Sequence, residues 1–265
     1  MPRFKLTIEY AGTRYSGWQV QKNARTVAGE IEQAARTVTG RKDFELYGSG
    51  RTDAGVHALG QVAHLDVATS LPAESLRRRL NDELPADVNV LAATVVPHRF
   101  HARHDAVARR YLYQVSTRRT AFAKPFVWWV REALDVRRME EAAGAFVGLH
   151  DFASFTARDA RPDDDRSSRV LLDRLEIALD GSLVLIVVEG SHFLWKMVRR
   201  LVGVLVAIGE GGLDVTSAAA LVGSESDVPA RLTAPASGLF LERVYYQGDS
   251  RATPLTAAIG VRSVG

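Results

Sequence analysis

Residues 44–67 read FELYGSGRTDAGVHALGQVAHLDV, and the fold of the chain is decided around this stretch. Two short segments with strand character, Phe44 to Tyr47 and Gln61 to Val67, enclose a loop from Gly48 to Ala58. The second segment alternates between apolar and polar residues, which is the period of a strand with one buried face. The loop holds three glycines, which permit tight turns and close backbone contacts. The sequence therefore predicts two strands with a glycine-rich loop between them.

The segments on either side of this stretch predict a first half with mixed secondary structure. Phe4, Leu6, Ile8 and Tyr10 share one parity and predict a strand, whereas apolar residues from 27 to 38 recur at helical spacing before Gly40. In chain order the patterns predict a strand at 4–10, a helix at 27–38, strands at 44–47 and 61–67, a helix between Pro72 and Pro85, and strands at 88–96 and 108–116. The order β-α-β-β-α-β is that of a split βαβ unit.

The second half nearly repeats this order. The expected elements are a strand at 126–130, a helix at 135–146 capped by Asp135, a hairpin of strands at 170–179 and 183–189, helices at 192–208 and 216–221, and a strand at 238–246. The predicted fold class is α+β, with two split βαβ halves joined in one mixed, mostly antiparallel sheet and a central cleft. We expect halves at 1–117 and 118–248, surface loops at 158–168 and 223–237, and a poorly ordered tail at 249–265.

Composition limits the classes of protein to consider. The chain has 265 residues, of which 46% are hydrophobic and 25% charged, and this balance is typical of a folded globular protein. The absence of cysteine excludes a disulfide framework, a thiolate zinc site, an iron–sulfur cluster and a cysteine nucleophile. The N-terminus lacks a signal peptide, and no apolar stretch approaches the roughly 18 residues of a membrane span. We therefore expect a cytoplasmic protein.

The charged residues leave two interpretations open. The formal net charge is +3, but the basic residues are 29 arginines and only 5 lysines. Arginine binds phosphate oxygens in pairs and stacks on bases, so the excess is compatible with a surface that binds RNA or DNA. It is equally compatible with the base composition of the gene, since a true nucleic-acid surface requires the charges to cluster on one face.

The glycine-rich loop contains the first candidate for chemistry, Arg51 and Asp53. A carboxylate beside an arginine stays ionised and is oriented by it, which suits a nucleophile or a general base. A structural turn with an Arg–Asp pair is the alternative.

A second candidate is the segment Tyr10 to Gln21, where arginine and aromatic residues alternate with glycines, as in sites that bind single-stranded or flipped bases. An ordinary loop with a packed tryptophan is equally compatible with that segment.

Two further segments combine polar and apolar residues. In the strand 108–116, Tyr111 and Tyr113 share a face with an arginine, and core packing is the simplest interpretation of Tyr113. In the helix 192–208, Arg199 and Arg200 interrupt an apolar stripe, and a buried arginine requires an acidic partner.

Three histidines suggest a metal site. His98, His101 and His104 lie three residues apart, but this spacing fits neither one strand face nor the i, i+4 pair of zinc proteases. We therefore predict no metal site.

Together, the motifs resemble the tRNA pseudouridine synthase A family, which isomerises uridines in the anticodon stem-loop. The resemblance is carried by YSGWQVQ at 15–21, GRTDAGVHA at 50–58, NDELPADVNV at 81–90, FHAR at 100–103, RRY at 109–111 and MVR at 197–199. The motifs extend from about residue 5 to 246. The chain departs from the family at Ala28, where glutamine is usual, and in the acidic run 163–165, which bears only on RNA docking.

The resemblance implies the pseudouridine synthase fold and a role for each of four residues. Asp53 is the implied nucleophile, which attacks either C6 of uracil or C1′ of the ribose. Tyr111 is implied to stack on the flipped uracil, Arg199 to keep Asp53 ionised, and Arg51 to contact phosphate or to hold the place of the flipped nucleotide. The implied substrates are uridines 38, 39 and 40 of tRNA, the implied assembly is a homodimer, and no cofactor or metal is expected.

Two other functions remain open from the residues alone. Split βαβ halves also occur in RNA-binding modules without catalytic activity, although the aromatic RNP motifs are not present here. A hydrolytic N-glycosylase would use the same carboxylate. Product analysis separates the second alternative, because an isomerase leaves no abasic site.

Overall fold

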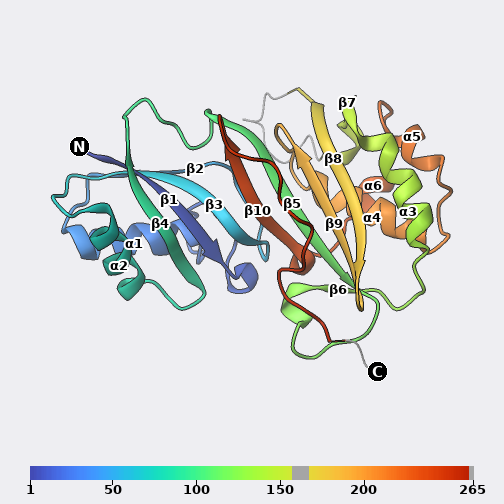
Figure 1. Ribbon diagram of the computed structural model, residues 1–265, viewed down its shortest axis with the longest axis horizontal. Helices are drawn as coiled ribbons and strands as arrows, with labels where there is room; N and C mark the ends of the chain where they lie inside the picture. The colour runs from blue at the N-terminus through green and yellow to red at the C-terminus, as the bar shows by residue number, and fades with distance from the viewer. Residues whose placement is uncertain (157–166, 263–265) are drawn as a thin grey trace. The chain divides into compact units, whose positions relative to one another are not determined.

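The structure, a computed structural model, describes residues 1–156 and 167–262 (Figure 1). The chain divides into two compact units. Unit 1 comprises residues 1–107 and 240–251, and unit 2 comprises residues 108–239 and the segment from 252. The units therefore differ from the continuous halves expected at 1–117 and 118–248, because a strand from near the C-terminus belongs to unit 1. Most of the expected loop at 158–168 lies outside the described residues.

Unit 1 contains the predicted β-α-β-β-α-β order, followed by one strand from the end of the chain. Its elements are β1 (Arg3–Tyr10), α1 (Val27–Thr39), β2 (Glu45–Gly48), β3 (His57–Asp66), α2 (Ala73–Glu83), β4 (Val88–Val96) and β10 (Leu239–Tyr246). Helix α1 begins after Thr26, whose hydroxyl accepts a hydrogen bond from the Gly29 N–H (3.3 Å), and ends at Gly40 in the left-handed conformation. The predicted helix end is thereby confirmed.

The sheet of unit 1 is built around β3. Strand β1 pairs antiparallel with both β3 and β4. The other edge of β3 is shared by two strands, since β2 pairs antiparallel with residues 63–66 and β10 pairs in parallel with His57 and Ala58. The predicted alternation of buried and more accessible residues in β1 is confirmed: the intervening residues are only partly buried, whereas the buried ones are Phe4, Leu6, Ile8 and Tyr10. Strand β3 thus begins at the end of the glycine-rich loop and anchors it to the core of the unit.

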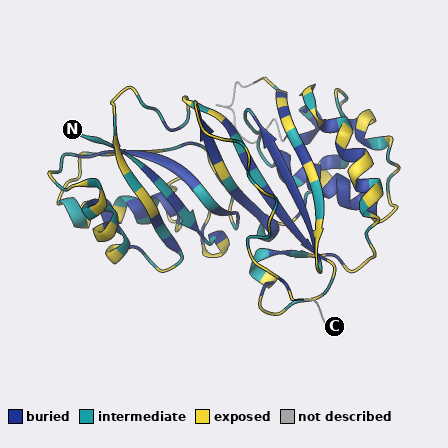
Figure 2. Ribbon diagram, viewed as in Figure 1, coloured by how far each residue is buried: buried dark blue, intermediate teal, exposed yellow. Residues whose placement is uncertain are grey.

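The strands belong to one mixed 10-stranded sheet, as predicted, and the strands within unit 2 follow the order β5-β9-β8-β7. Neighbouring strands in this order are antiparallel, and β6 pairs in parallel with β5. The elements of unit 2 are β5 (Ala106–Ser116), β6 (Trp128–Trp129), α3 (Val136–Ala143), β7 (Gly148–Asp151), β8 (Arg169–Asp180), β9 (Leu183–Gly190), α4 (Met197–Gly209), α5 (Ser217–Leu221) and α6 (Val228–Arg231). Every residue of β9 is buried (Figure 2). Both units are mixtures of helix and mostly antiparallel sheet, which confirms the α+β class.

Several elements of unit 2 differ from the expected ones. The sequence patterns predict neither strand β7 nor helix α6, and the strand predicted at 126–130 is shortened to the two residues of β6. Helix α4 begins at Met197 rather than at residue 192, because Lys196 has a φ of 60° and so cannot belong to a right-handed helix. The predicted cap of α3 is confirmed, since the Asp135 carboxylate accepts a hydrogen bond from the Arg138 N–H (3.2 Å).

The C-terminal segment is bound to unit 2, which differs from the poorly ordered tail expected at 249–265. The Oε1 atom of the buried Gln114 accepts hydrogen bonds from the N–H groups of Ala258 (2.6 Å) and Ile259 (3.3 Å). The guanidinium of Arg118 donates to the carbonyl of Arg262, and Val261 is buried. The segment has no apolar periodicity, and its order comes from these contacts with β5 and the loop after it.

Among the described residues, no helix combines the length and the apolar character that crossing a membrane requires.

The substitution Gln114→Leu tests the attachment of the C-terminal segment. It preserves the approximate volume but leaves the N–H groups of Ala258 and Ile259 without their acceptor, so we expect the free energy of unfolding to fall by about 1–3 kcal/mol. Urea denaturation measures this change, and trypsin should cleave faster after Arg251. The exposed Gln33, changed to leucine, is the control. Equal stability of the two variants would contradict the attachment.

Candidate active site

The loop between β2 and β3 carries Asp53 directly after one buried residue, Thr52, and three residues before another, Val56. Thr52 and Val56 are 6% and 3% exposed, and Ser49 at the start of the loop is also buried. Asp53 itself is half-buried, and Arg51 is exposed. The loop therefore presents a carboxylate that is partly accessible, between residues that are fixed in the core of unit 1.

The first part of the loop is held by Gln61 of β3. Its side chain is fully buried, and its Oε1 atom accepts a hydrogen bond from the Ser49 hydroxyl (2.7 Å). Its Nε2 group donates to the carbonyl of Gly50 (3.0 Å). A buried amide that satisfies polar groups of a loop fixes the path of that loop, because each unmade hydrogen bond would cost free energy.

The second part of the loop is held by the segment that follows β1. The Trp18 N–H donates to the carbonyl of Thr52 (3.1 Å), and the Gly55 N–H donates to the carbonyl of Tyr15 (3.3 Å). The Tyr10 and Thr52 hydroxyls are 2.8 Å apart. Sequence reasoning singled out both segments but did not predict that one holds the other. The signal that could have indicated it is the presence of glycines in both.

Two glycines of the segment after β1 permit this close approach. A β-carbon on Gly12 would lie 1.9 Å from the carbonyl oxygen of Val56, and one on Gly17 would lie 2.6 Å from the carbonyl oxygen of Thr52. Gly17 also has a φ of 98°, which only glycine adopts without strain. The Gly12 N–H donates to Nδ1 of His57 (3.0 Å), the first residue of β3. The two backbones are therefore in direct contact on both sides of Asp53.

The aromatic residues of the same segment are structural. Tyr15 and Trp18 are 3% and 4% exposed, so the structure favours a packed loop over a surface that stacks on bases. The Tyr15 hydroxyl donates to Oδ1 of Asp87 (2.5 Å), and the Arg25 guanidinium lies 4.8 Å from the ring centre. Burial raises the pKa of the Tyr15 hydroxyl, and the hydrogen bond to Asp87 raises it further. Tyr15 thus stays protonated as a donor.

Tyr111 and Arg199 belong to unit 2, whereas Arg51 and Asp53 belong to unit 1. Tyr111 is half-buried, and its ring contacts Phe193 edge-on with centroids 5.0 Å apart. Its neighbour Tyr113 is fully buried and donates to the carbonyl of Pro235 (2.8 Å), which confirms that Tyr113 is a core residue. Tyr111 is therefore the more accessible of the two tyrosines.

The two arginines of α4 differ in their surroundings. Arg199 is half-buried, and its Nε group donates to the carbonyl of Ala234 (2.7 Å). Arg200 is 7% exposed and has no acidic partner among the described residues, which corrects the expectation that a buried arginine in this helix forms an ion pair. Its Nη1 group donates to the carbonyl of Ser154 (3.2 Å), and burial lowers its pKa.

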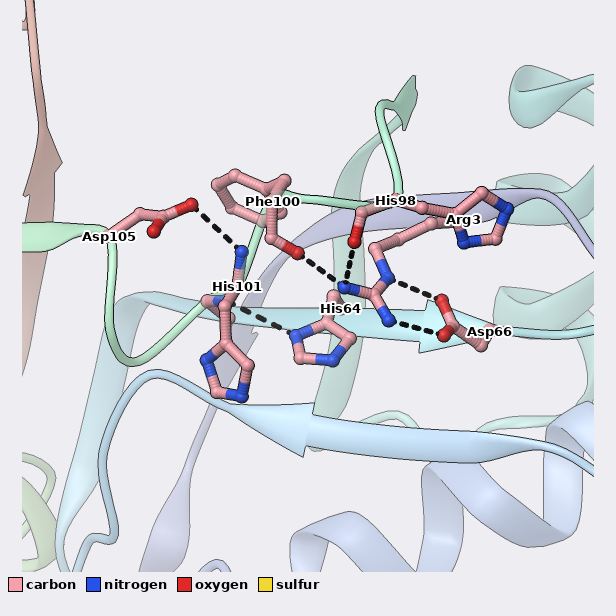
Figure 3. A network of polar contacts seen from close by, with 8 residues as sticks. Arg3, His64, Asp66, His98, Phe100, His101 and Asp105 are labelled. Atoms are coloured by element: carbon pink, nitrogen blue, oxygen red, sulfur yellow. Dashed lines mark hydrogen bonds and ion pairs between the residues drawn. The ribbon is translucent and has the colours of Figure 1, made fainter.

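Apart from the loop, unit 1 contains a polar network that joins β1 and β3 to the segment after β4 (Figure 3). The Arg3 guanidinium donates to both carboxylate oxygens of Asp66 (2.6 and 2.5 Å) and to the carbonyls of His98 and Phe100 (2.6 Å each). The hydrogen bonds from Arg3 lower the pKa of the Asp66 carboxyl. This network holds the FHAR segment against the sheet of unit 1.

Two histidines extend the network. The His64 Nδ1 atom accepts a hydrogen bond from the Ala102 N–H (3.2 Å), and the rings of His64 and His101 lie 4.8 Å apart. His101 Nδ1 accepts from the N–H groups of Arg103 and His104 (3.1 and 3.2 Å). Within residues 1–156 and 167–262, no group of three histidine or carboxylate side chains is placed to hold a metal ion. The His101 ring nitrogen instead supports the backbone turn at residues 101–104.

Comparison with known proteins identifies the class of enzyme. The family described as "tRNA pseudouridine synthase" matches residues 6–105 and 142–247, a range that contains Asp53 and Arg199 but not Tyr111. A protein named "tRNA pseudouridine synthase A" from Rhodopseudomonas palustris (strain BisA53) is 42% identical over 250 residues, which cover 93% of this chain and 100% of the relative. This agreement extends over nearly the whole chain.

Proteins of the same name from other organisms are similar. The one from Paramagnetospirillum magneticum is 40% identical (94% of this chain, 97% of the relative), and the one from Citrifermentans bemidjiense is 40% identical (93% and 98%). The chain therefore belongs to the tRNA pseudouridine synthase A family. A solved "Cbf5-Nop10-Gar1 Complex" aligns with 77% of this chain and 45% of that chain, at 10% identity and a TM-score of 0.34, which is too low to support a conclusion.

The contact between Gly17 and the loop predicts a strong effect of Gly17→Ala. The new β-carbon would clash with the Thr52 carbonyl in an unfavourable backbone conformation, so we expect a loss of about 2–4 kcal/mol in the free energy of unfolding. Gly40→Ala is a matched control, since Gly40 has a φ of 66° but no atom within 4 Å of the added carbon. The control should lose about 1–2 kcal/mol. Equal losses in urea denaturation would show that the contact is unimportant.

The pKa of His64 predicts a pH-dependent stability. Burial lowers this pKa from 6.5 to about 4, so the unfolded chain binds more protons than the folded one between these values. The free energy of unfolding should therefore fall as the pH is lowered from 7, and His64 should account for about 2 kcal/mol of the loss at pH 5. His64→Asn keeps an acceptor for the Ala102 N–H but does not titrate. Denaturation at pH 7 and 5 should give a smaller difference for this variant, and an equal difference would contradict the assignment.

Proposed function

We propose that this protein isomerises uridines 38, 39 and 40 in the anticodon stem-loop of tRNA to pseudouridine, with Asp53 as the nucleophile. Membership of the family supports the class of reaction, the conversion of uridine to pseudouridine in tRNA. The observation that carries the choice of nucleophile is a half-buried, partly accessible carboxylate on a loop whose backbone is hydrogen-bonded on both sides of it, at Thr52 and at Gly55. A nucleophile requires both features, since it has to reach its substrate and to be held in position.

The proposed reaction needs only a carboxylate and a means of proton transfer. An Asp53 oxygen bonds either to C1′ of the ribose, with departure of uracil, or to C6 of the ring, after which the glycosidic bond breaks. The base then rotates and C5 bonds to C1′, while the bond to Asp53 breaks. The proton on C5 leaves and N1 gains one, so that atoms and electrons balance. No oxidant, reductant or group donor is consumed, which agrees with the expected absence of a cofactor.

Three other residues have proposed roles in this reaction. Tyr111 would stack on the flipped uracil and assist removal of the C5 proton, and its half-buried position on β5 supports an accessible ring. Arg199 would keep Asp53 ionised, because an adjacent cation favours the charged form of a carboxyl group. Arg51 is exposed beside Asp53, which suits contact with a phosphate or with the position that the flipped nucleotide leaves.

The substrate determines the proposed partner and location. A uridine within a stem has to leave the base stack, at a cost of a few kcal/mol, and contacts to the RNA backbone have to offset that cost. A homodimer, in which one protomer docks the tRNA that the other modifies, would supply the long contact surface. The proposed location is the cytoplasm, where the tRNA substrate is present.

The substitution Asp53→Asn tests the proposed function. The amide preserves the shape of the side chain but is not a nucleophile, so we expect normal folding and tRNA binding, with pseudouridine formation reduced at least about a thousandfold. Release of tritium from tRNA labelled at uracil C5 measures turnover. Asp43→Asn, an exposed carboxylate shortly before β2, is the matched control and should keep its activity. Turnover of the Asp53 variant within tenfold of wild type would disprove the role.

Analysis of the wild-type product separates the proposal from the other two functions. An isomerase leaves the RNA chain intact and without abasic sites, whereas a glycosylase would release free uracil and create sites that alkali cleaves. A binding module would change neither the base nor the chain. Mapping of pseudouridine in tRNA from cells that lack the protein then identifies the positions modified.

A further inference from the structure

We propose that Tyr10 is a positioning residue for the Asp53 carboxylate and that it acts through the hydroxyl of Thr52. The proposal rests on the proposed function of Asp53 and extends it to the residues that hold the nucleophile in place. Its basis is the hydrogen bond of 2.8 Å between the Tyr10 and Thr52 hydroxyls, which joins the end of β1 to the residue directly before Asp53. The two residues are separated by 42 positions in the sequence.

Neither hydroxyl is placed to touch the substrate. Tyr10 is 4% exposed and Thr52 is 6% exposed, whereas Asp53 is half-buried. A role in binding or in proton transfer to RNA therefore does not fit these two residues. Loss of this hydrogen bond should cost more free energy than loss of a surface contact, because a buried hydroxyl without a partner is no longer solvated by water. The geometry restricts Tyr10 and Thr52 to an effect on the loop.

Thr52 is fixed by its side chain and by its backbone. Its carbonyl accepts a hydrogen bond from the Trp18 N–H (3.1 Å), and its hydroxyl is bonded to Tyr10. The next residues form a turn in which the Val56 N–H donates to the carbonyl of Asp53 (3.1 Å). Since one peptide bond separates Thr52 from Asp53, a change in the orientation of Thr52 is transmitted directly to the α-carbon of Asp53.

Tyr10 is a rigid support for such a bond. It is the last residue of β1 and is paired on both sides, with Ala58 of β3 and with Val88 of β4. The register between β1 and β3 shifts directly before Tyr10, and such irregularities redirect side chains at the ends of strands. The Tyr10 ring also contacts Trp18, with centroids 6.1 Å apart. The hydroxyl is thus held by a central strand of the sheet rather than by a loop.

The substitutions Thr52→Val and Thr52→Ser test the role of the hydroxyl. Valine keeps the shape but removes the hydrogen bond, whereas serine keeps the hydroxyl. We expect kcat for pseudouridine formation to fall about 10- to 100-fold in Thr52→Val and in Tyr10→Phe, since a displacement of about 1 Å at a reacting group has effects of this size. KM for tRNA should change less than about threefold, because neither residue binds RNA. Thr52→Ser should stay within about threefold of wild type.

Two further measurements separate positioning from a general loss of stability. Tyr246→Phe is the matched control, because it removes another buried tyrosine hydroxyl of unit 1, which donates to the carbonyl of Ala102 (2.7 Å). It should destabilise the protein to a similar extent without lowering kcat. The double variant Tyr10→Phe/Thr52→Val should lose no more kcat than either single variant, because both changes remove the same bond.

Three results would overturn the proposal. These are an equal fall of kcat in Tyr10→Phe and Tyr246→Phe, an equal fall in Thr52→Ser and Thr52→Val, and additive effects in the double variant. Asp53→Asn separates this failure from that of the proposed function. If Asp53→Asn is inactive while Tyr10→Phe and Thr52→Val have the kcat of wild type, only the positioning role is wrong. If Asp53→Asn retains turnover, the proposed nucleophile is wrong.

Discussion

The loop that carries Asp53 has to satisfy its backbone hydrogen bonds while it leaves one side chain accessible. Buried N–H and carbonyl groups require partners, and a loop outside a sheet has no ladder to provide them. In unit 1, the partners come from Gln61 of β3 and from the segment that follows β1. This contact requires glycine at positions 12 and 17, because any side chain there would separate the two backbones. The site therefore depends on the packing of one loop against another.

Much of the fold is predictable from local patterns. The strand predicted at 88–96 coincides with the bounds of β4, and the predicted cap residues Gly40 and Asp135 mark helix ends correctly, because each cap depends on residues within one turn of the chain. The partner of a strand is not encoded locally. Strand β10 is evident as an apolar segment, but its pairing with two residues of β3 places it in unit 1 rather than in unit 2.

The site is also predictable only in part, because local sequence patterns indicate the loop but not the residues that hold it. Composition alone singles out the loop with Arg51 and Asp53, since glycines and charges are concentrated there. The hydrogen bonds that join Tyr10 and Gly12 to the loop and to its end span 42 and 45 positions, and no periodic pattern in the sequence indicates them. Trp18 belongs to a segment compatible with base binding, yet it is buried. Arg200 is a second case in which the residue type alone gives the wrong prediction. It is buried without an ion pair in the described part of the chain, and this arrangement depends on tertiary packing.

The discontinuity of unit 1 has a consequence for protein synthesis. The first 107 residues leave the ribosome before β10 exists, because residues 108–239 are translated in between. At about 5–20 residues per second, those 132 residues delay the arrival of β10 by roughly 7–26 s. Until then, His57 at the end of the loop lacks Phe240, whose ring stacks on it with centroids 4.8 Å apart. The nascent chain thus holds an incomplete sheet edge, and the support of the loop is completed only when the chain is nearly finished.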